Sequence, residues 1–181
     1  MASEFQRQKI AGVFEAMDVD GDGLLQESDF VALTARWTAI RGPGDHGRLA
    51  AIMMGWWRAV LAMADHDADA KVTLDEVLLL VDRLGEMPEE VRGTAEAMFT
   101  AIDENADGRI SREEYNRLIE GWTGRDTDTD DIFPLLDLDG DGHISEEEFV
   151  RLWTEFWSGD DAEAPGTWVF GRFELPMARK G

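Results

Sequence analysis

The chain of 181 residues contains no cysteine, only three histidines and a single tyrosine. Without cysteine it can form neither a disulfide framework nor a thiolate metal site. Its 17 basic residues stand against 39 acidic ones, which gives a formal net charge of −22. Proteins that bind the phosphate backbone of nucleic acids neutralise it with Lys and Arg, so this balance excludes nucleic acid as a partner.

Long hydrophobic runs are missing too. No stretch approaches the roughly 18 consecutive apolar residues of a membrane-spanning helix. The first nine residues carry no apolar run of signal-peptide length, and they lack the Met-Gly start of an N-myristoylated protein. We therefore expect a cytoplasmic protein without a membrane anchor. Its hydrophobic content of 44% is ordinary for a protein that folds around a core.

The acidic residues gather in four twelve-residue segments that share one pattern. Side chains with oxygen atoms stand at positions 1, 3 and 5 of each segment, and a carboxylate closes it at position 12. A calcium ion takes about six to eight oxygen ligands, and such a loop supplies them from these side chains and from the backbone carbonyl of position 7. The pattern predicts four candidate calcium sites.

Each predicted site consists of four side chains and one carbonyl oxygen. The first has Asp18, Asp20, Asp22, the Leu24 carbonyl and Asp29; the second has Asp65, Asp67, Asp69, the Lys71 carbonyl and Glu76; the third has Asp103, Asn105, Asp107, the Arg109 carbonyl and Glu114; the fourth has Asp137, Asp139, Asp141, the His143 carbonyl and Glu148.

Two of these loops depart from the pattern. Asp29 closes the first site with a side chain one methylene shorter than Glu, which should weaken Ca²⁺ there and let Mg²⁺ compete. In the second site Ala70 replaces the glycine of position 6, and the left-handed conformation expected there costs an L-residue roughly 1–2 kcal/mol. Two outcomes stay open for this loop: it binds an ion, or it only braces the first site. We therefore expect three or four calcium ions.

Apolar residues at helical spacing flank every loop and predict an all-α chain. Position 8 of the four loops holds Leu25, Val72, Ile110 and Ile144, which suits a short two-stranded contact between paired loops. We expect the first loop to pair with the second and the third with the fourth. Pro134 stands in the helix entering the fourth loop and predicts that this helix is short or kinked.

The resulting architecture is four helix–loop–helix units in two pairs, packed as one compact globule. We expect residues 1–84 to form the first pair and residues 85–158 the second. The third part, residues 159–181, is an apolar tail that we expect to fold back on the core. Its apolar residues are Trp168, Val169, Phe170, Phe173 and Leu175.

The set of loops resembles the EF-hand superfamily. The uneven loop spacing, the aspartate that closes the first loop and the tail sequence of residues 156–171 resemble the sarcoplasmic calcium-binding proteins and their bacterial relative calerythrin. This resemblance implies one compact globule rather than a dumbbell. It also implies a second site that is often degenerate, which Ala70 fits.

For function, the resemblance implies a monomeric calcium buffer or a self-contained calcium-responsive signal protein. The alternative is a sensor that exposes an apolar groove to a protein target when calcium binds. We expect the tail to occupy that groove, which favours the buffer. No cysteine–histidine or serine–histidine arrangement lies outside the metal loops, so we do not expect an enzyme.

Seven tryptophans and eight methionines suggest a further alternative, a carrier similar to the coelenterazine-binding proteins and photoproteins. Photoproteins place His, Tyr and Trp around their chromophore. Here His66 and His143 lie within predicted metal loops, leaving His46, and Tyr115 is the single tyrosine. The tryptophans are therefore expected mainly to fill the core.

Overall fold

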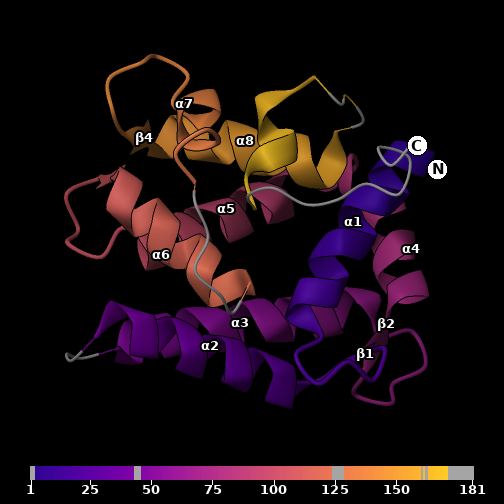
Figure 1. Cartoon of the computed structure of the whole chain (residues 1–181). Coiled ribbons are helices and arrows are strands. Elements are labelled where there is room, and N and C mark those ends of the chain that lie inside the picture. Colours follow the sequence, from indigo (N-terminus) through magenta and orange to yellow (C-terminus); the bar gives the residue numbers. More distant parts are fainter. Residues whose placement is uncertain (1–2, 43–45, 124–128, 160, 162, 171–181) are drawn as a thin grey trace, which may run out of the picture.

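The structure of the chain is a computed structural model, and it describes residues 3–42, 46–123, 129–159, 161 and 163–170. Within these ranges the chain is built from helices, with two pairs of very short strands (Figure 1). The α-helices are α1 (Glu4–Met17), α2 (Glu27–Arg41), α3 (Gly47–Ala64), α4 (Leu74–Leu84), α5 (Pro88–Ile102), α6 (Arg112–Thr123), α7 (Phe133–Leu136) and α8 (Glu146–Ser158). The predicted all-α class is confirmed.

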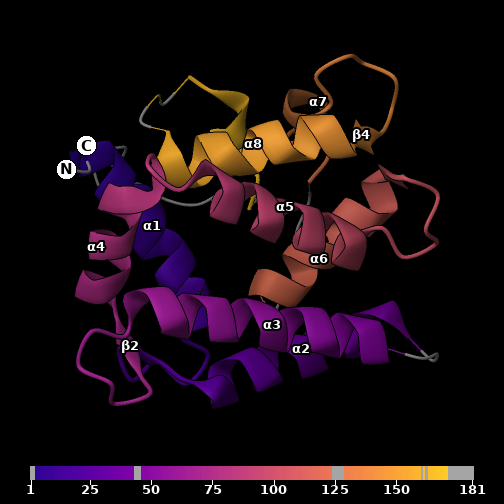
Figure 2. The same cartoon turned by 180° about the vertical axis from the view of Figure 1, so that it is seen from behind.

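The strands connect the loops in pairs. Strand β1 (Leu24–Leu25) pairs antiparallel with β2 (Val72–Thr73), and β3 (Arg109–Ile110) pairs antiparallel with β4 (Ile144–Ser145). Leu25 faces Val72 in one pair and Ile110 faces Ile144 in the other, and all four side chains are buried. The predicted contacts between paired loops are confirmed. The two loop pairs lie on opposite sides of the molecule (Figures 1 and 2).

Helix boundaries follow from local chemistry. Ser145 precedes α8 within the fourth loop. Its hydroxyl accepts a hydrogen bond from the Glu148 N–H, while the Glu148 carboxylate accepts from the Ser145 N–H. This reciprocal cap starts a helix at the residue that follows it. Pro134 lies in the first turn of α7, which is only four residues long, so the predicted short helix is confirmed.

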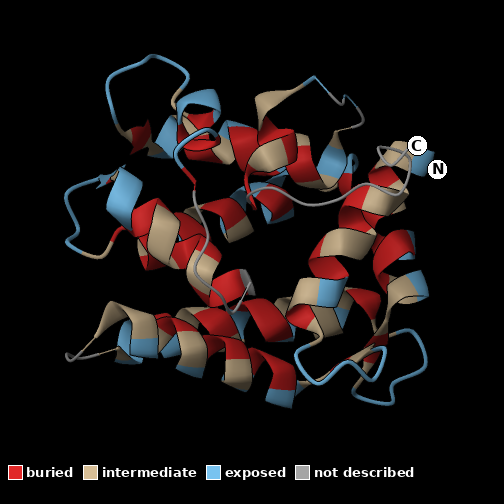
Figure 3. Ribbon diagram, viewed as in Figure 1, coloured by how far each residue is buried: buried red, intermediate tan, exposed pale blue. Residues whose placement is uncertain are grey.

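An aromatic cluster joins the helices of all four units into one core. Trp56 of α3 lies with its ring centroid 5.6 Å from Phe30 of α2, 5.8 Å from Trp122 of α6 and 5.8 Å from Trp153 of α8. The buried faces of the helices point inward, toward this cluster (Figure 3). Helix α3 also packs against α5, and both helices lie toward the front in Figure 2. The predicted compact globule is confirmed.

Helices α2 and α6 approach closely, and a glycine permits it. A Cβ on Gly121 of α6 would lie 3.0 Å from the Trp37 Cβ and 3.2 Å from the Trp37 Cα. Beside this contact, the Arg36 guanidinium donates to the Gly121 carbonyl at 2.7 Å and to the Trp122 carbonyl at 2.8 Å. These hydrogen bonds satisfy carbonyls at the end of α6 that have no partner within the helix.

The first helix holds the end of the last one. Gln6 Nε2 donates to the Trp157 carbonyl at 2.6 Å, and Lys9 Nζ donates to the Gly159 carbonyl at 3.1 Å. Lys9 is completely buried, and its ammonium lies 5.1 Å from the centroid of the Phe156 ring. A cation at a helix C-terminus interacts favourably with the helix dipole. These contacts join α1 and α8, which lie far apart in the sequence.

The chain after α8 returns to the core. A 3₁₀ turn (Pro165–Trp168) leads to Val169 and Phe170, both buried. The Tyr115 hydroxyl donates to the Trp168 carbonyl at 3.1 Å and to the Val169 carbonyl at 3.2 Å. Phe173 and Leu175 lie outside the described residues. The division into residues 1–84, 85–158 and 159–181 stays a prediction.

No helix in the described part of the chain has the length and apolar content needed to cross a membrane.

The close approach of α2 and α6 can be tested with one substitution at two positions. We expect Gly121→Ala to lower the free energy of unfolding by about 1–3 kcal/mol, because the new Cβ meets backbone and Cβ atoms of Trp37 that cannot yield without moving α2. The matched control is Gly93→Ala in α5, where nothing lies within 4 Å of the new Cβ. This variant should gain about 0.5–1 kcal/mol. Chemical unfolding measures both, and equal effects at the two positions would contradict the close approach.

Candidate metal centres

Each of the four predicted loops gathers carboxylates within reach of one ion. In each group, one ligand atom per residue lies within 4.8 Å of those of the others. The groups are Asp18, Asp20 and Asp22; Asp65, Asp67 and Glu76; Asp103, Asp107 and Glu114; and Asp137, Asp139, Asp141 and Glu148. The fourth group brings together all four predicted side chains.

Backbone N–H groups inside each loop hold the first aspartate in place. In the fourth loop, Asp137 Oδ2 accepts from the Gly142 N–H at 2.8 Å and Oδ1 accepts from the Asp141 N–H at 3.2 Å. Asp18, Asp65 and Asp103 accept the corresponding hydrogen bonds in their own loops. The loop therefore curls around its first carboxylate, and this curl brings the other carboxylates toward it.

The closing carboxylate spans its loop. Glu148 Oε2 accepts from the Asp139 N–H at 2.9 Å, and Oε1 accepts from the Ser145 N–H at 2.9 Å. Glu76 and Glu114 make equivalent hydrogen bonds to the two ends of their loops. Because this residue also lies in the first turn of the exiting helix, the loop and the helix start are one structural unit.

Asp29 accepts the same kind of hydrogen bonds in the first loop, but its side chain is one methylene shorter than that of Glu. Its Oδ1 accepts from the Val19 N–H at 3.1 Å and its Oδ2 from the Gln26 N–H at 2.9 Å. The side chain is only 2% exposed, and it is not part of the group formed by the other aspartates of its loop. Burial raises the pKa of the Asp29 carboxyl. The missing methylene thus leaves the closing carboxylate with backbone partners rather than beside the other predicted ligands.

One further predicted carboxylate stands apart from its group. Asp69 is outside the carboxylate group of the second loop, and its Oδ1 accepts from the Lys71 N–H at 2.9 Å. Asn105 Oδ1 accepts from the Asp107 N–H at 3.2 Å. The carbonyls of Leu24, Lys71, Arg109 and His143 belong to the residues at or next to the short strands, where position 7 places them. The ligand role of each residue stays a prediction.

The carboxylates of these loops lie close together, and this affects their pKa values. Desolvation raises the pKa of the Asp67 carboxyl, and the neighbouring Asp65 and Asp69 raise it further. Desolvation also raises the pKa of Asp20, and the neighbouring Asp18, Asp29 and Asp22 add smaller increases. The smaller contributions mean that adjacent carboxylates oppose one another's ionisation. A divalent cation among them would relieve this repulsion, and an all-oxygen donor set suits a hard ion such as Ca²⁺.

The backbone of the loops turns into the left-handed region twice, at positions 4 and 6. Glycines occupy both positions in the first and fourth loops, with φ between 70° and 87°. In the second loop both are alanines, Ala68 at φ 59° and Ala70 at φ 64°; the third loop has one, Ala106 at φ 59°. Sequence reasoning found the cost at Ala70 and missed position 4, although Gly21 and Gly140 at that position were a readable signal. The second loop therefore carries the most backbone strain.

Comparison with known proteins agrees with this geometry. A family model described as an EF-hand domain pair matches residues 95–154, and a model described as an EF hand matches residues 10–33. These segments contain the third, fourth and first loops.

Relatives and solved structures extend the similarity. A sarcoplasmic calcium-binding protein (alpha-B and -A chains) of Penaeus sp. is 33% identical over 109 residues, which cover 54% of this chain and 57% of the relative. The match thus spans little more than half the length of that relative.

Two solved structures share the fold. That of a sarcoplasmic calcium-binding protein from amphioxus superposes with a TM-score of 0.72 at 19% identity, covering 96% of this chain and 100% of the other. That of the calcium-loaded apo form of the coelenterazine-binding protein from Renilla muelleri superposes with a TM-score of 0.73 at 22% identity, covering 94% and 99%.

Strain in the second loop leads to a prediction. Replacing both Ala68 and Ala70 with glycine should raise calcium affinity at this loop by a factor of about 5–30 for each relieved position, because the ion no longer has to hold an L-residue at positive φ. Calorimetric titration of the native chain and the variant measures this. Ala106→Gly in the third loop is the matched control with a single relieved position. The prediction fails if the glycine variant has the same calcium affinity as the native chain and only a higher melting temperature in the presence of chelator. That result would show that the loop is strained without calcium as well as with it.

The short side chain of Asp29, which closes the first loop, leads to a second prediction. Asp29→Glu should raise calcium affinity at the first loop by about tenfold and reduce competition by Mg²⁺, since the longer side chain brings its oxygens to the other carboxylates. The Gly23 N–H, which donates to Asp18 at 2.8 Å, gives an NMR signal that follows this loop alone. Lower affinity in the variant would show that the buried environment of Asp29 cannot hold the extra methylene.

Proposed function

We propose that the chain is an EF-hand calcium-binding protein of the sarcoplasmic calcium-binding type, and that it acts as a calcium buffer or a self-contained calcium-responsive protein. Its relatives named above are calcium-binding proteins, which supports a role in binding rather than in catalysis. We further propose three or four bound calcium ions, held by the side chains and carbonyls predicted above, with Mg²⁺ competing at the first site. A monomer in the cytoplasm is the working state we propose, in keeping with the sarcoplasmic relatives.

The observation that carries this proposal is the placement of the segment after α8. Phe170 lies with its ring centroid 4.8 Å from Trp122, 5.3 Å from Trp153 and 4.8 Å from Phe156. A calcium sensor offers an apolar groove of this kind to a target helix when it opens. Here residues of the same chain occupy the space between α6 and α8. This supports a protein that responds to calcium without recruiting a target through that surface.

The methionines give the sensor alternative little support. Sensors expose flexible methionines on the groove that binds the target. In this chain Met17, Met53 and Met98 are between 0% and 3% exposed, and they lie in three different helices within the core. They fill the interior rather than forming one surface.

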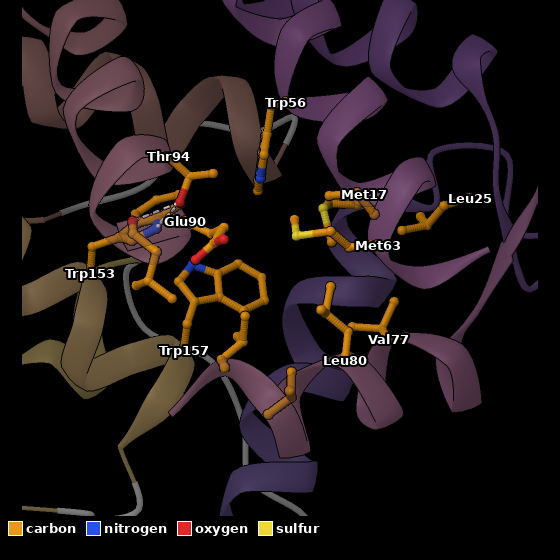
Figure 4. Close-up of a pocket in the computed structure, with 14 residues that line it drawn as sticks. Met17, Leu25, Trp56, Met63, Val77, Leu80, Glu90, Thr94, Trp153 and Trp157 are labelled. Atoms are coloured by element: carbon orange, nitrogen blue, oxygen red, sulfur yellow. Dashed lines mark hydrogen bonds between the residues drawn. The ribbon is translucent and has the colours of Figure 1, made fainter. Parts of the chain in front are cut away.

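A ligand carrier is the other alternative, because one structural neighbour is a coelenterazine-binding protein. An apolar recess does lie between the helix pairs, and Trp56, Trp153, Trp157, Met17 and Met63 are among its lining residues (Figure 4). Its volume is about 50 Å³, whereas sites for drug-sized ligands measure about 300–1,000 Å³. This size supports core packing as the role of these tryptophans.

A larger groove of about 400 Å³ adjoins the recess, between α3 and α5. Small residues such as Gly55, Ala59 and Gly93 line it. Of its two polar side chains, Thr94 already accepts a hydrogen bond from Trp153 Nε1 and donates to the Val91 carbonyl, which leaves Glu90. A specific chromophore site needs several convergent polar groups, so this groove also favours the buffer over the carrier.

Binding of a hydrophobic dye tests the proposal. In the native chain, calcium loading should not increase fluorescence of an anilinonaphthalene dye, since the groove is already filled. Gly166→Ala should create a calcium-dependent increase, because its Cβ would lie 2.4 Å from the Leu152 carbonyl and dislodge the segment from α8.

Gly85→Ala is the control, since nothing lies within 4 Å of a Cβ at that position. A native chain that gains dye fluorescence on calcium loading as strongly as Gly166→Ala would overturn the buffer proposal in favour of a sensor.

A further inference from the structure

Position 2 of the third loop differs from position 2 of the others. Val19, His66 and Leu138 occupy it in the first, second and fourth loops, and all three side chains are exposed. Glu104 occupies it in the third loop, and its side chain is only 20% exposed. Two ligand candidates of the third loop are also buried, since Asp103 is 6% exposed and Glu114 is 3% exposed. The third loop is therefore packed against the rest of the protein.

Two arginines hold the Glu104 carboxylate. Arg117 of α6 donates from Nε to Oε2 at 2.6 Å, and Arg41 of α2 places its Nε 3.7 Å from Oε1. Meanwhile the Glu104 backbone N–H donates to Glu114 Oε2 at 2.6 Å. The residue that the arginines hold thus also orients the carboxylate that closes the loop.

Arg41 lies in α2, the helix that follows the first loop. Helix α2 begins in the first loop, with Asp29 in its first turn, and ends at Arg41. Its fifteen residues make a rod of about 22 Å. At the far end, the Arg41 side chain is 12% exposed and also donates from Nη1 to the Ala101 carbonyl at 3.1 Å, in the last turn before the third loop.

Contacts along its length hold α2 against α6. A shift of the first turn of α2 is therefore transmitted to Arg41 at its other end. Arg36 donates to two carbonyls at the end of α6, and Gly121 leaves no space between α6 and Trp37. Rigid elements of this kind can carry an energetic coupling between distant sites. The arrangement connects loops that belong to different strand pairs.

We propose that Arg41 is a positioning residue of the third calcium site and that, through Glu104, it couples this site to the first. This inference rests on the proposed calcium binding. Closure of the first loop around an ion fixes the start of α2, and Arg41 at its end then holds Glu104, whose amide orients Glu114. Such a coupling is reciprocal, so an ion in the third site favours the first by the same factor.

Affinity of the third site alone does not measure this coupling. The guanidinium of Arg41 repels a nearby cation, so removing it can strengthen binding electrostatically while it loosens the loop. The informative quantity is the change in affinity at the third site when the first is disabled, compared between chains with and without Arg41. In that comparison the direct electrostatic effect of Arg41 cancels.

Backbone amides give site-resolved signals for the experiment. The Gly23, Gly108 and Gly142 N–H groups each donate to the first aspartate of their own loop, at 2.8, 2.9 and 2.8 Å. Calcium titration of the ¹⁵N-labelled full chain therefore follows three loops separately. The first site is disabled by Asp18→Asn together with Asp20→Asn.

We expect this disabling to lower calcium affinity at Gly108 by about fivefold or more in the chain with Arg41. In the Arg41→Gln background the change should fall below about twofold. Arg112→Gln is the matched control. It removes one positive charge from the third loop itself, where Arg112 pairs with the exposed Asp130, and it should leave the coupling intact.

Glu104→Gln breaks the same link from the other side and should abolish the coupling too. It also carries the test if Arg41→Gln fails to fold, which circular dichroism reports. Equal coupling with and without the Arg41–Glu104 link would overturn this inference while leaving calcium binding untouched. A Gly108 signal that never responds to calcium would instead overturn the proposed function of the third site.

Discussion

Each of the four loops brings negative charges close together, and the fold has to offset their repulsion. Three or four acidic side chains must lie within a few ångströms of one another in every loop, and the interior of the molecule has to keep them there. Backbone N–H groups provide the first restraint, because they hold the first and last carboxylates of each loop. The short strands provide the second, since they fasten the loops together in pairs through buried side chains such as Leu25 and Val72. The helices on either side of each loop then pack their apolar faces into the core.

The core is shared between the two loop pairs rather than divided. Trp56 stands at its centre and touches aromatic rings from α2, α6 and α8. Polar contacts at the edges extend the connection: Lys9 and Gln6 hold the end of α8, and Arg36 and Arg41 hold the ends of α6 and α5. In each case a side chain satisfies carbonyls that the helix itself leaves without a donor. The arrangement differs from a dumbbell, in which two pairs would each have a separate core.

Much of this could be predicted from the sequence, because the relevant signals are local. The spacing of Asp137, Asp139, Asp141 and Glu148 predicted the carboxylate group of the fourth loop. Pro134 predicted the short α7, and Ile110 and Ile144 predicted the strand contact. The resemblance to the EF-hand superfamily rests on the same residues. What escaped prediction depends on contacts between distant segments. Nothing near Glu104 in the sequence indicates that Arg41 reaches it, and nothing near Gly121 indicates that Trp37 needs its space.

One local signal was available but unused, the glycines at position 4 of the first and fourth loops.

The polar contacts described above join three of the loops into a ring. The first connects to the third through α2, the third to the fourth through β3 and β4, and the fourth back to the first through α8 and Lys9. The second loop joins the first at the strand pair β1 with β2, and its flanking helices α3 and α4 pack against α2, α5, α8 and α1. Packing from several sides therefore holds the second loop in place, even though alanines occupy its two positions of positive φ.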